Sequence, residues 1–432
     1  MSKRAVSRIK TQAPSVAAEL PDAIRHLMMP MIAGMDATKT GLLAFVHAVG
    51  RAALGELFES EADRVAGPKG KRIDDRQAHR WGTTRTPVPF GGPGIIVDRP
   101  RVRSKNGREV RLPLIDELRR NDPLPDRVAE QIVLGVSTRG YARSLEPVAA
   151  GTKTRRTGKS SASRAFIEKT TEKMGAFLEE TLNEVDIIAL FIDGIQVAGH
   201  TVVVALGVTK DGSKVPLGLW MGSTENAVVC TALVQNLIER GLKIDAPILC
   251  VIDGGKGIRK ALQDVLGDRA VIQRCQVHKI RNVRDHLPES RKAYVSGQMS
   301  EAYKSKSAKV AKRRLLQLAS WLAKNGEDDA AASLREGLDE TLTVLKLSLP
   351  PVLRRTFATT NAVENMNGTI RRITRNVKRW RGGNMIRRWV SLSLIEAQKK
   401  FRRVRGHDRM HELVHALRPA DTVTIEEEVK VA

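Results

Sequence analysis

The chain has 432 residues and is strongly basic, with 73 Lys and Arg against 48 Asp and Glu and a formal net charge of +25. This excess is larger than solubility requires, and it favours a polyanionic partner, most often nucleic acid. Cys230, Cys250 and Cys275 are the only cysteines, which excludes a disulfide framework and indicates a reducing compartment. No apolar run approaches the roughly 18 residues of a membrane span, so we expect no membrane partner and a cytoplasmic protein.

The first region, residues 1–115, is predicted to contain helices and a small β-hairpin. Residues 1 to about 60 have helical spacing, and residues 79–113 change to Gly, Pro and β-branched residues around an Asn106-Gly107 turn. The hairpin carries Arg99, Arg101 and Arg103, and basic side chains on a β-ribbon can bind phosphates. A solvated face on a structural hairpin explains these arginines equally well, and both interpretations stay open.

Residues 116–178 predict a helix-turn-helix-like DNA-binding region. One helix in DRVAEQIV is followed by a GVSTRG break, a second short helix, and a third that opens in TGKSSASRAF. A recognition helix reads the major groove from its N-terminal end, so Lys159, Ser163 and Arg164 are the expected DNA contacts. Any helical hairpin with a polar loop has this pattern, but the basic surroundings favour DNA binding.

Two apolar runs in the centre of the chain predict buried strands that each end at an aspartate. The run 187–192 stops at Asp193, and the run 247–252 stops at Asp253. Catalytic groups of α/β proteins gather where the strands end. Asp before Gly is also a common turn residue after a strand, so each aspartate alone has an equally good structural explanation.

The elements around these runs predict an α/β fold. Strands at 200–208 and 214–221 join at an Asp211-Gly212 turn, helices begin near 223–225 and after 255, and a last strand covers 270–272. Three strands, helix, strand, helix, strand is the order of the ribonuclease H-like fold. We place this core at 179–281 plus 357–405, interrupted by an all-helical insertion at 282–356 and followed by a tail at 406–432.

The stretch from Arg371 to Arg405 contains 13 Lys or Arg and one acid, with aromatic residues interleaved. A solvated helical face usually alternates its charges, and this stretch does not, so a phosphate-contacting face is the better interpretation. The expected DNA contacts are Arg371, Arg372, Arg375, Lys378 and Arg379.

A third acid completes a candidate metal site. Phosphodiester chemistry with two Mg²⁺ ions needs converging carboxylates, and Glu364 is the best addition to Asp193 and Asp253. Asn361 as N-cap with Glu364 three residues later would be a capping box, which needs no catalysis. Cys275-x-x-His278 does not predict structural zinc, because no second such pair exists in the chain. His278 is either near the chemistry or a buried structural histidine.

Four ordered motifs resemble the Mutator-type transposases of bacterial insertion sequences. They are LFIDG around Asp193, VIDGGKGI around Asp253, RCQVHKIRNV around His278 and TTNAVENMN around Glu364, and similarity extends over about residues 75–405. The resemblance implies a DDE enzyme with Asp193, Asp253 and Glu364 as metal ligands, which uses Mg²⁺ to cut transposon ends and transfer 3′-OH ends. The segment NVKRWRGGNM after Glu364 departs from the commonest family pattern.

The expected function is therefore that of a DDE transposase acting on terminal inverted repeats and target DNA. We expect two Mg²⁺ ions, replaceable by Mn²⁺, a homodimer or higher homo-oligomer on DNA, and a location at the bacterial nucleoid. A junction resolvase of the same fold, which hydrolyses without joining, is one alternative. A DNA-binding regulator with a decayed site is another, although all three carboxylates are present.

Overall fold

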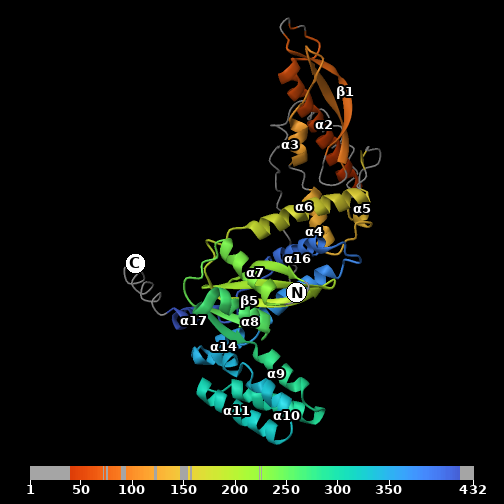
Figure 1. The fold of residues 1–432 in the computed structure, drawn as a ribbon. Coiled ribbons are helices and arrows are strands. Elements are labelled where there is room, and N and C mark those ends of the chain that lie inside the picture. The colour runs from red at the N-terminus through yellow and green to blue at the C-terminus, as the bar shows by residue number, and fades with distance from the viewer. Residues whose placement is uncertain are drawn as a thin grey trace, which may run out of the picture. The chain divides into compact units, whose positions relative to one another are not determined.

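The computed structural model describes residues 39–71, 73, 76–88, 94–120, 124–145, 154–155, 158–222, 224 and 226–418. The chain divides into two compact units, Met1–Glu168 and Lys169–Ala432. Figure 1 labels their helices and strands. No helix in the described part of the chain is both long and apolar enough to cross a membrane.

The described part of the first unit begins with a long helix and a β-hairpin, as predicted, while residues 1–38 of the predicted helical region lie outside the described residues. Its elements are α2 (Lys39–Ala66), β1 (Ala78–Val88), β2 (Gly94–Ser104), β3 (Glu109–Val110), α3 (Leu114–Arg120), α4 (Leu124–Val133), α5 (Tyr141–Ser144), β4 (Thr154–Arg155) and the start of α6 (Lys159–Glu179). The predicted Asn106-Gly107 turn joins β2 to β3, with Gly107 at a φ of 74° that favours glycine. Phe58 of α2 and Ile95 of β2 are buried in one core cluster, which holds the helix on the hairpin.

Three helices follow α3 where the sequence predicted them within residues 116–178. α4 ends at Val133, the GVSTRG break follows, and α5 has only four residues. α6 begins at Lys159, inside the Ser-rich segment expected to start the third helix. The helices are therefore confirmed, while their use as a helix-turn-helix stays a prediction.

A five-stranded mixed sheet organises the second unit. Its strands are β5 (Ile187–Val197), β6 (His200–Thr209), β7 (Lys214–Gly222), β8 (Ile248–Ile252) and β9 (Ala270–Arg274), in the order β7-β6-β5-β8-β9. β5, β6 and β7 pair antiparallel, and β8 and β9 run parallel to β5. The predicted Asp211-Gly212 hairpin and the predicted succession of strands and helices are confirmed.

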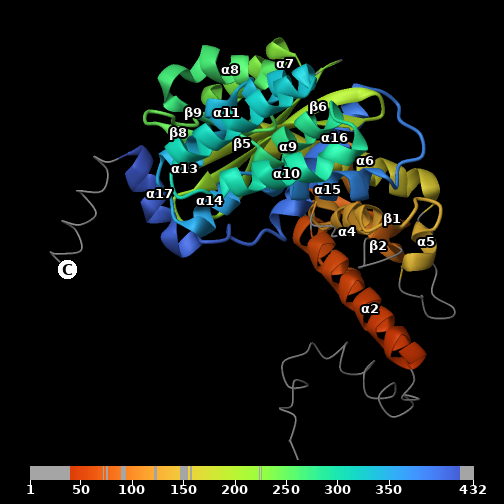
Figure 2. The same ribbon diagram turned by 90° about the horizontal axis from the view of Figure 1, so that it is seen from below.

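Helices cover both faces of this sheet (Figure 2). α7 (Ala227–Glu239) and α8 (Lys256–Leu266) pack with one set of strand residues. α14 (Pro351–Phe357), α15 (Asn361–Thr374), α16 (Gly383–Gln398) and α17 (Met410–Leu417) pack with the other set. The short 3₁₀ helices η2 (Gly267–Arg269) and η4 (His407–Arg409) precede β9 and α17. The sequence analysis placed residues 407–417 in the C-terminal tail. In the structure they form η4 and α17, and α17 packs into the core.

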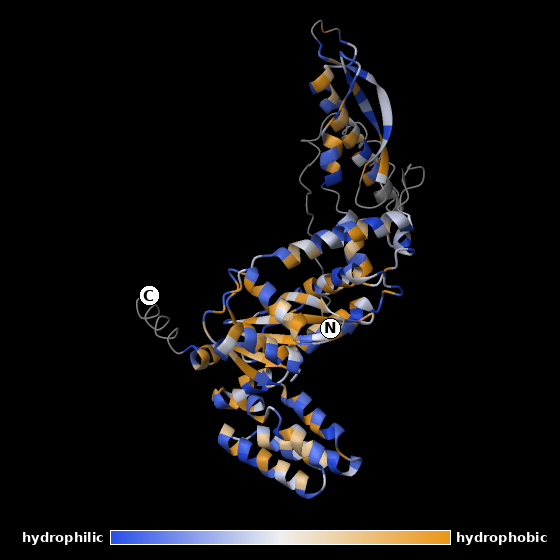
Figure 3. Ribbon diagram, viewed as in Figure 1, coloured by the Kyte–Doolittle hydropathy of each residue, from blue (hydrophilic) through white to orange (hydrophobic). Residues whose placement is uncertain are grey.

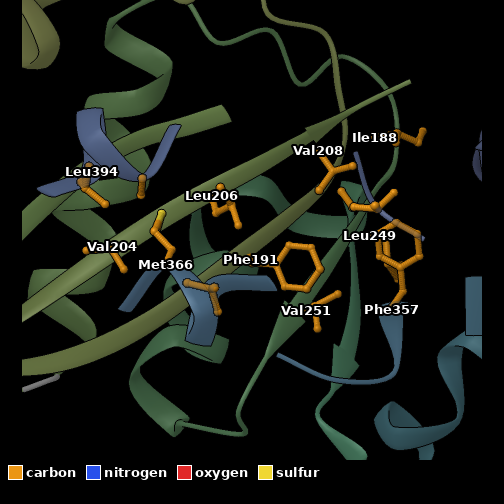
Figure 4. Packing of buried hydrophobic residues seen from close by; sticks show 14 of the residues in the cluster. Ile188, Phe191, Val204, Leu206, Val208, Leu249, Val251, Phe357, Met366 and Leu394 are labelled. Atoms are coloured by element: carbon orange, nitrogen blue, oxygen red, sulfur yellow. The ribbon is translucent and has the colours of Figure 1, made fainter. Parts of the chain in front are cut away.

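The continuous apolar runs predicted as buried strands explain this layering, because both faces of β5 are buried. Ile187, Leu190 and Ile192 contact the α7 and α8 layer, while Ile188 and Phe191 contact the opposite layer. Figure 3 shows the hydrophobic residues concentrated in the sheet, and Figure 4 shows the packing around Phe191. The Phe191 and Phe357 rings stack with centroids 6.1 Å apart, which fixes the end of α14 on the sheet.

A helical subdomain interrupts this sheet-and-helix core between β9 and α14. Its elements are α9 (Gln276–Asp285), α10 (Glu289–Tyr303), α11 (Ala308–Lys324), α12 (Asp328–Arg335), η3 (Leu338–Leu342) and α13 (Thr343–Lys346). Residues 282–356 are all described and contain no strand, which confirms their predicted helical character. They bury a hydrophobic cluster of their own, including Val295, Met299, Leu315 and Leu322.

Two details differ from the sequence predictions. β5 does not stop at Asp193 but continues to Val197, because its second half remains paired with β6 after it leaves β8. α7 begins at Ala227 with Asn226 as its N-cap, whose side chain accepts a 3.0 Å hydrogen bond from Val229 N. Of the predicted start Ser223-Thr224-Glu225, Ser223 and Glu225 lie outside the described residues.

Candidate active site

Asp193 and Asp253 occupy equivalent positions on two neighbouring parallel strands. The last parallel pair between β5 and β8 is Phe191 with Val251, and each aspartate lies two residues further along its strand direction. Asp253 directly follows β8, whereas Asp193 lies within β5 at the point where β5 separates from β8. The two carboxylates therefore meet at one edge of the parallel part of the sheet, as expected for catalytic groups of α/β proteins.

Backbone amides fix one oxygen of each carboxylate. Gly194 N donates a 3.0 Å hydrogen bond to Asp193 Oδ1, and Gly255 N donates a 2.8 Å hydrogen bond to Asp253 Oδ1. Gly254, between Asp253 and Gly255, has a φ of 113°, a backbone conformation that residues other than glycine rarely adopt. The Asp-Gly-Gly sequence thus forms a tight turn and holds a carboxylate, so the two explanations open at Asp253 are compatible.

The environment of Asp193 disfavours its negative charge. Burial raises the pKa of Asp193 to about 6, and the charge of Asp253 adds to this rise. His278 and the Gly194 amide act in the opposite direction, while Glu364 raises the pKa further. Two further acids and one histidine therefore act electrostatically on Asp193, and such a crowding of carboxylates favours a bound cation.

Glu364 lies on α15 and belongs to a compact hydrogen-bonded group. The Thr360 hydroxyl donates a 2.7 Å hydrogen bond to Glu364 Oε1 and lies 3.3 Å from His278 Nδ1 and 3.4 Å from Cys275 Sγ. His278 Nδ1 is 3.8 Å from Glu364 Oε1. The Cys-x-x-His segment at the start of α9 and the acid of α15 are therefore joined through one buried threonine.

The capping-box explanation of Glu364 is wrong. α15 begins at Asn361 with Thr360 as its N-cap, so Glu364 occupies the fourth helical position instead of the third. No side-chain cap hydrogen bond is present at this helix start. Glu364 receives a hydrogen bond from the Thr360 side chain, whereas in a capping box it would accept one from the N-cap backbone.

Cys275 and His278 stabilise each other's charged forms, the thiolate and the imidazolium. Burial would raise the pKa of the Cys275 thiol, but hydrogen bonds with His278 and Thr360 outweigh it and lower this pKa. The hydrogen bond with Cys275 raises the pKa of His278 against the effect of burial. His278 is thus both near the acids and hydrogen-bonded, so the two interpretations of this residue are not exclusive.

Sequence reasoning did not identify the role of Asn367. Its side-chain amide donates a 2.7 Å hydrogen bond to Asp193 Oδ2, and the residue is fully buried. Asn367 is three positions after Glu364, which places both side chains on one face of α15. That spacing was the available signal, but a contact between residues 174 positions apart requires the tertiary structure. Thr360 is the second site residue without an assigned role in the sequence.

The donor set fits a hard divalent cation in its chemistry. Carboxylate oxygens are the ligands that Mg²⁺ prefers, and the charges of Asp253 and Glu364 add to the effect of burial in raising the pKa of Asp193. Within the described residues, no three His, Cys, Asp or Glu side chains form a group that could hold one metal ion as they stand. The Glu364 carboxylate is held instead by its hydrogen bond from Thr360.

The predicted DNA contacts of the second unit form an exposed cationic group beyond Glu364. Arg371 and Arg372 lie in the last turn of α15, Arg375 is its C-cap, and Lys378 and Arg379 follow. All five are exposed, and none has a carboxylate partner among the described residues. The aromatic residues of this stretch do not join them, because Trp389 is buried and Trp380 and Phe401 pack against the core.

The predicted DNA contacts of the first unit differ in whether other side chains already contact them. On β2, Arg101 pairs with Glu109 at 2.6 Å, Arg103 lies 4.5 Å from the Trp81 ring centre, and Arg99 Nε is 3.5 Å from Thr86 Oγ1. These partners favour a structural role for the hairpin arginines. Lys159 and Arg164 are exposed on the first turns of α6, and Ser163 is half-buried there.

Comparison with known families decides what kind of protein carries this site. A sequence model of the transposases of the Mutator family matches residues 26–404. The chain belongs to the Mutator family of transposases. The match includes every residue of the carboxylate group, so the family resemblance seen in the four motifs is confirmed.

Members of this family similar to the chain are named as insertion-sequence transposases. The transposase of ISRM5 from Rhizobium meliloti (strain 1021) is 27% identical over 376 residues, which cover 84% of this chain and 90% of that protein. The transposase of IS905 from Lactococcus lactis subsp. lactis (strain IL1403) is 27% identical over 287 residues, 64% of this chain and 68% of that protein. A probable transposase from Corynebacterium diphtheriae is 30% identical over 195 residues, and the chain spans 55% of its length.

Proposed function

We propose that this Mutator-family chain is a DDE transposase that binds insertion-sequence ends, cleaves the DNA and transfers 3′-OH ends into target DNA. The observation that carries the proposal is the equivalent placement of Asp193 and Asp253 on two neighbouring parallel strands, together with the Glu364 carboxylate 3.8 Å from His278. The sheet order β7-β6-β5-β8-β9 supports a ribonuclease H-like core around these residues. The exposed cations that follow Glu364 offer phosphate contacts beside them.

Asp193, Asp253 and Glu364 would hold two Mg²⁺ ions, with Mn²⁺ as a substitute. A bound pair would activate the attacking oxygen and stabilise the leaving oxygen of the phosphodiester. The protein's own part is orientation: Gly194 and Gly255 amides fix one oxygen of each aspartate, and Asn367 fixes the second oxygen of Asp193. Thr360 holds Glu364 beside His278.

A cleavage and joining assay tests the proposal. Oligonucleotide duplexes that carry the ends of the element are incubated with the full chain and Mg²⁺, and nicked and joined products are separated on a denaturing gel. We expect both products from the natural chain and neither from Asp193→Asn or Asp253→Asn. Nicked product without joined product would favour a resolvase instead, and undiminished activity in both variants would reject the site.

A further inference from the structure

A cavity of the second unit is lined by the sequence neighbours of Cys275 and Thr360. It has a volume of about 380 Å³ and is formed by α9, α10, α13, α14 and the turn before α15. Much of its wall is apolar, with Val277, Ile280, Val344, Leu345, Pro351 and Ala358. Val277 is 47% exposed there, an unusual position for an aliphatic side chain next to a polar site.

The charged residues of this cavity are all cationic. Lys304, Arg354 and Arg355 line it, and none of the described lining residues is Asp or Glu. Lys304 has Glu301 beside it at 2.8 Å, while Arg355 is exposed and has no carboxylate partner among the described residues. An apolar floor with cations and no acids fits a ligand that combines a flat apolar part with a negative charge.

Two polar groups of the cavity lining lack partners. Arg354 Nε is buried without an acceptor, although Arg354 Nη1 donates to Ser305 O at 3.3 Å. The Tyr303 hydroxyl, near Thr341, makes no hydrogen bond of normal geometry. Buried polar groups in native proteins are normally satisfied, so these two covered groups next to the cavity are candidate donors to a ligand once the side chains over them shift.

The cavity and the carboxylate group share a wall. Gln276 and Val277 line the cavity between Cys275 and His278 in the sequence, and Ala358 and Thr359 line it just before Thr360. Gln276 N donates a 2.9 Å hydrogen bond to Ala358 O, which ties the two sides of this wall together. A ligand in the cavity is therefore held next to any DNA strand that reaches Glu364.

We propose that this cavity receives one unpaired nucleotide of the DNA substrate, displaced from the duplex next to the phosphodiester that reacts. The proposal rests on the proposed function and specifies how the DNA is held there. The base of this nucleotide would lie against the apolar floor and accept a hydrogen bond from Arg354 or Tyr303. The phosphates of the nucleotide would contact Lys304 and Arg355. A base is flat, largely apolar on its faces and rich in acceptors, which matches the lining better than a simple anion does.

Binding of a duplex with one unpaired nucleotide tests this proposal. The full chain is titrated into two fluorescein-labelled duplexes of the same length and sequence, one fully paired and one with a single-nucleotide bulge, and anisotropy is measured. We expect the bulged duplex to bind at least about fivefold more tightly, the lower range for placing one base in an apolar or stacked site. A 2-aminopurine at the bulge should change its emission on binding.

Two variants localise the preference to the cavity. Ser300→Trp on α10 fills the cavity, and Arg355→Glu reverses a charge at its wall. Gln298→Trp, exposed on another face of the same helix, and Arg335→Glu, exposed on α12, are the matched controls. The cavity variants should lose the preference for the bulged duplex. Their affinity for the paired duplex should match that of their controls, because Arg355→Glu and Arg335→Glu change the net charge equally.

The outcomes separate this proposal from the proposed function. Binding and cleavage of the paired duplex without a preference for the bulge would overturn the cavity proposal alone, whereas failure to bind either duplex would overturn the proposed function. A preference that survives Ser300→Trp would also overturn the cavity proposal, because the bulge would then be bound elsewhere. Competition by free dAMP without a bulge preference would show a mononucleotide site and equally reject the proposal.

Discussion

The Asn367 side-chain amide donates a 2.7 Å hydrogen bond to Asp193 Oδ2 and thereby connects α15 directly to β5. Glu364 lies one helical turn before Asn367 on the same face of α15. The bond therefore sets the position of Glu364 relative to Asp193. Asn367 touches only a candidate ligand, so it is a positioning residue.

Removal of this bond should damage both stability and activity. Asn367→Ala leaves a cavity and a buried acceptor, and we expect a loss of about 1–3 kcal/mol in the free energy of unfolding. Asn367→Asp should be worse at pH 8, because a second buried carboxylate is placed against Asp193. Thermal unfolding of both variants at pH 5 and pH 8 measures this. Equal melting temperatures of Asn367→Asp at the two pH values would contradict the charge explanation.

The raised pKa of Asp193 predicts a pH-dependent stability. Its value of about 6 in the folded chain, against an ordinary 3.8, means that the folded state binds the proton more tightly. The contribution of this proton to the free energy of unfolding is fully present below about pH 3.8 and is lost as pH rises through 6. The difference amounts to about 3 kcal/mol. Asp193→Asn removes the charge but loses one acceptor oxygen.

We therefore expect Asp193→Asn to unfold at a higher temperature than the natural chain at pH 8 without divalent cations. The free energy of unfolding should rise by about 1–2 kcal/mol after the lost hydrogen bond is subtracted. At pH 4 the gain should vanish, and Mg²⁺ should stabilise the natural chain more than the variant. Calorimetry with EDTA or with Mg²⁺ measures all three comparisons. A variant less stable than the natural chain at pH 8 would argue against charge crowding at Asp193.

Glu364→Gln separates metal binding from structural support. The Gln carbonyl oxygen can still accept the 2.7 Å hydrogen bond from Thr360, so folding and DNA binding should be preserved. A neutral amide is a much poorer ligand for Mg²⁺, so cleavage and joining should fall by at least about 100-fold. Glu396→Gln, which only removes a surface pair with Lys399, is the matched control. Near-normal activity of Glu364→Gln would remove Glu364 from the site.

The helical subdomain should depend on one buried lysine. Lys279 Nζ donates to Ser333 O at 2.8 Å and Glu336 O at 2.7 Å, and its side chain is 4% exposed. Lys279→Met preserves volume but removes the donor to the Ser333 and Glu336 carbonyls, which should cost about 1–3 kcal/mol in the free energy of unfolding. Chemical denaturation measures it, with the exposed Lys260→Met as control. A loss no larger than in the control would rule out this anchoring role.

The exposed cations after Glu364 should act through phosphates. Replacing Arg371, Arg372 and Arg375 with Ala should weaken binding to all duplex sequences alike and reduce the slope of log affinity against log salt by about 2.7. Anisotropy titrations between low and moderate salt measure this slope. An unchanged slope would identify these arginines as a solvated face.

The sequence by itself determined the sheet and its acids. Apolar runs before Asp193 and Asp253 predicted strands buried on both faces, because such strands lack polar alternation. The Asp-Gly hairpin and the glycines that end α7 and α8 are local signals, since they depend on backbone conformations that few residues adopt. The four ordered motifs indicated the family, because their residues and their order along the chain can be read without the fold.

Only the tertiary structure decided which side chains meet. Asn367 with Asp193, and Thr360 with Cys275 and His278, are contacts across 174, 85 and 82 positions, and no local periodicity encodes them. The same reason explains the error at the start of α15, where Thr360 serves as the N-cap and Asn361 was expected. The positions of the aromatic residues in the basic stretch were likewise left open by the sequence, because burial of Trp389 depends on how α16 packs against the sheet.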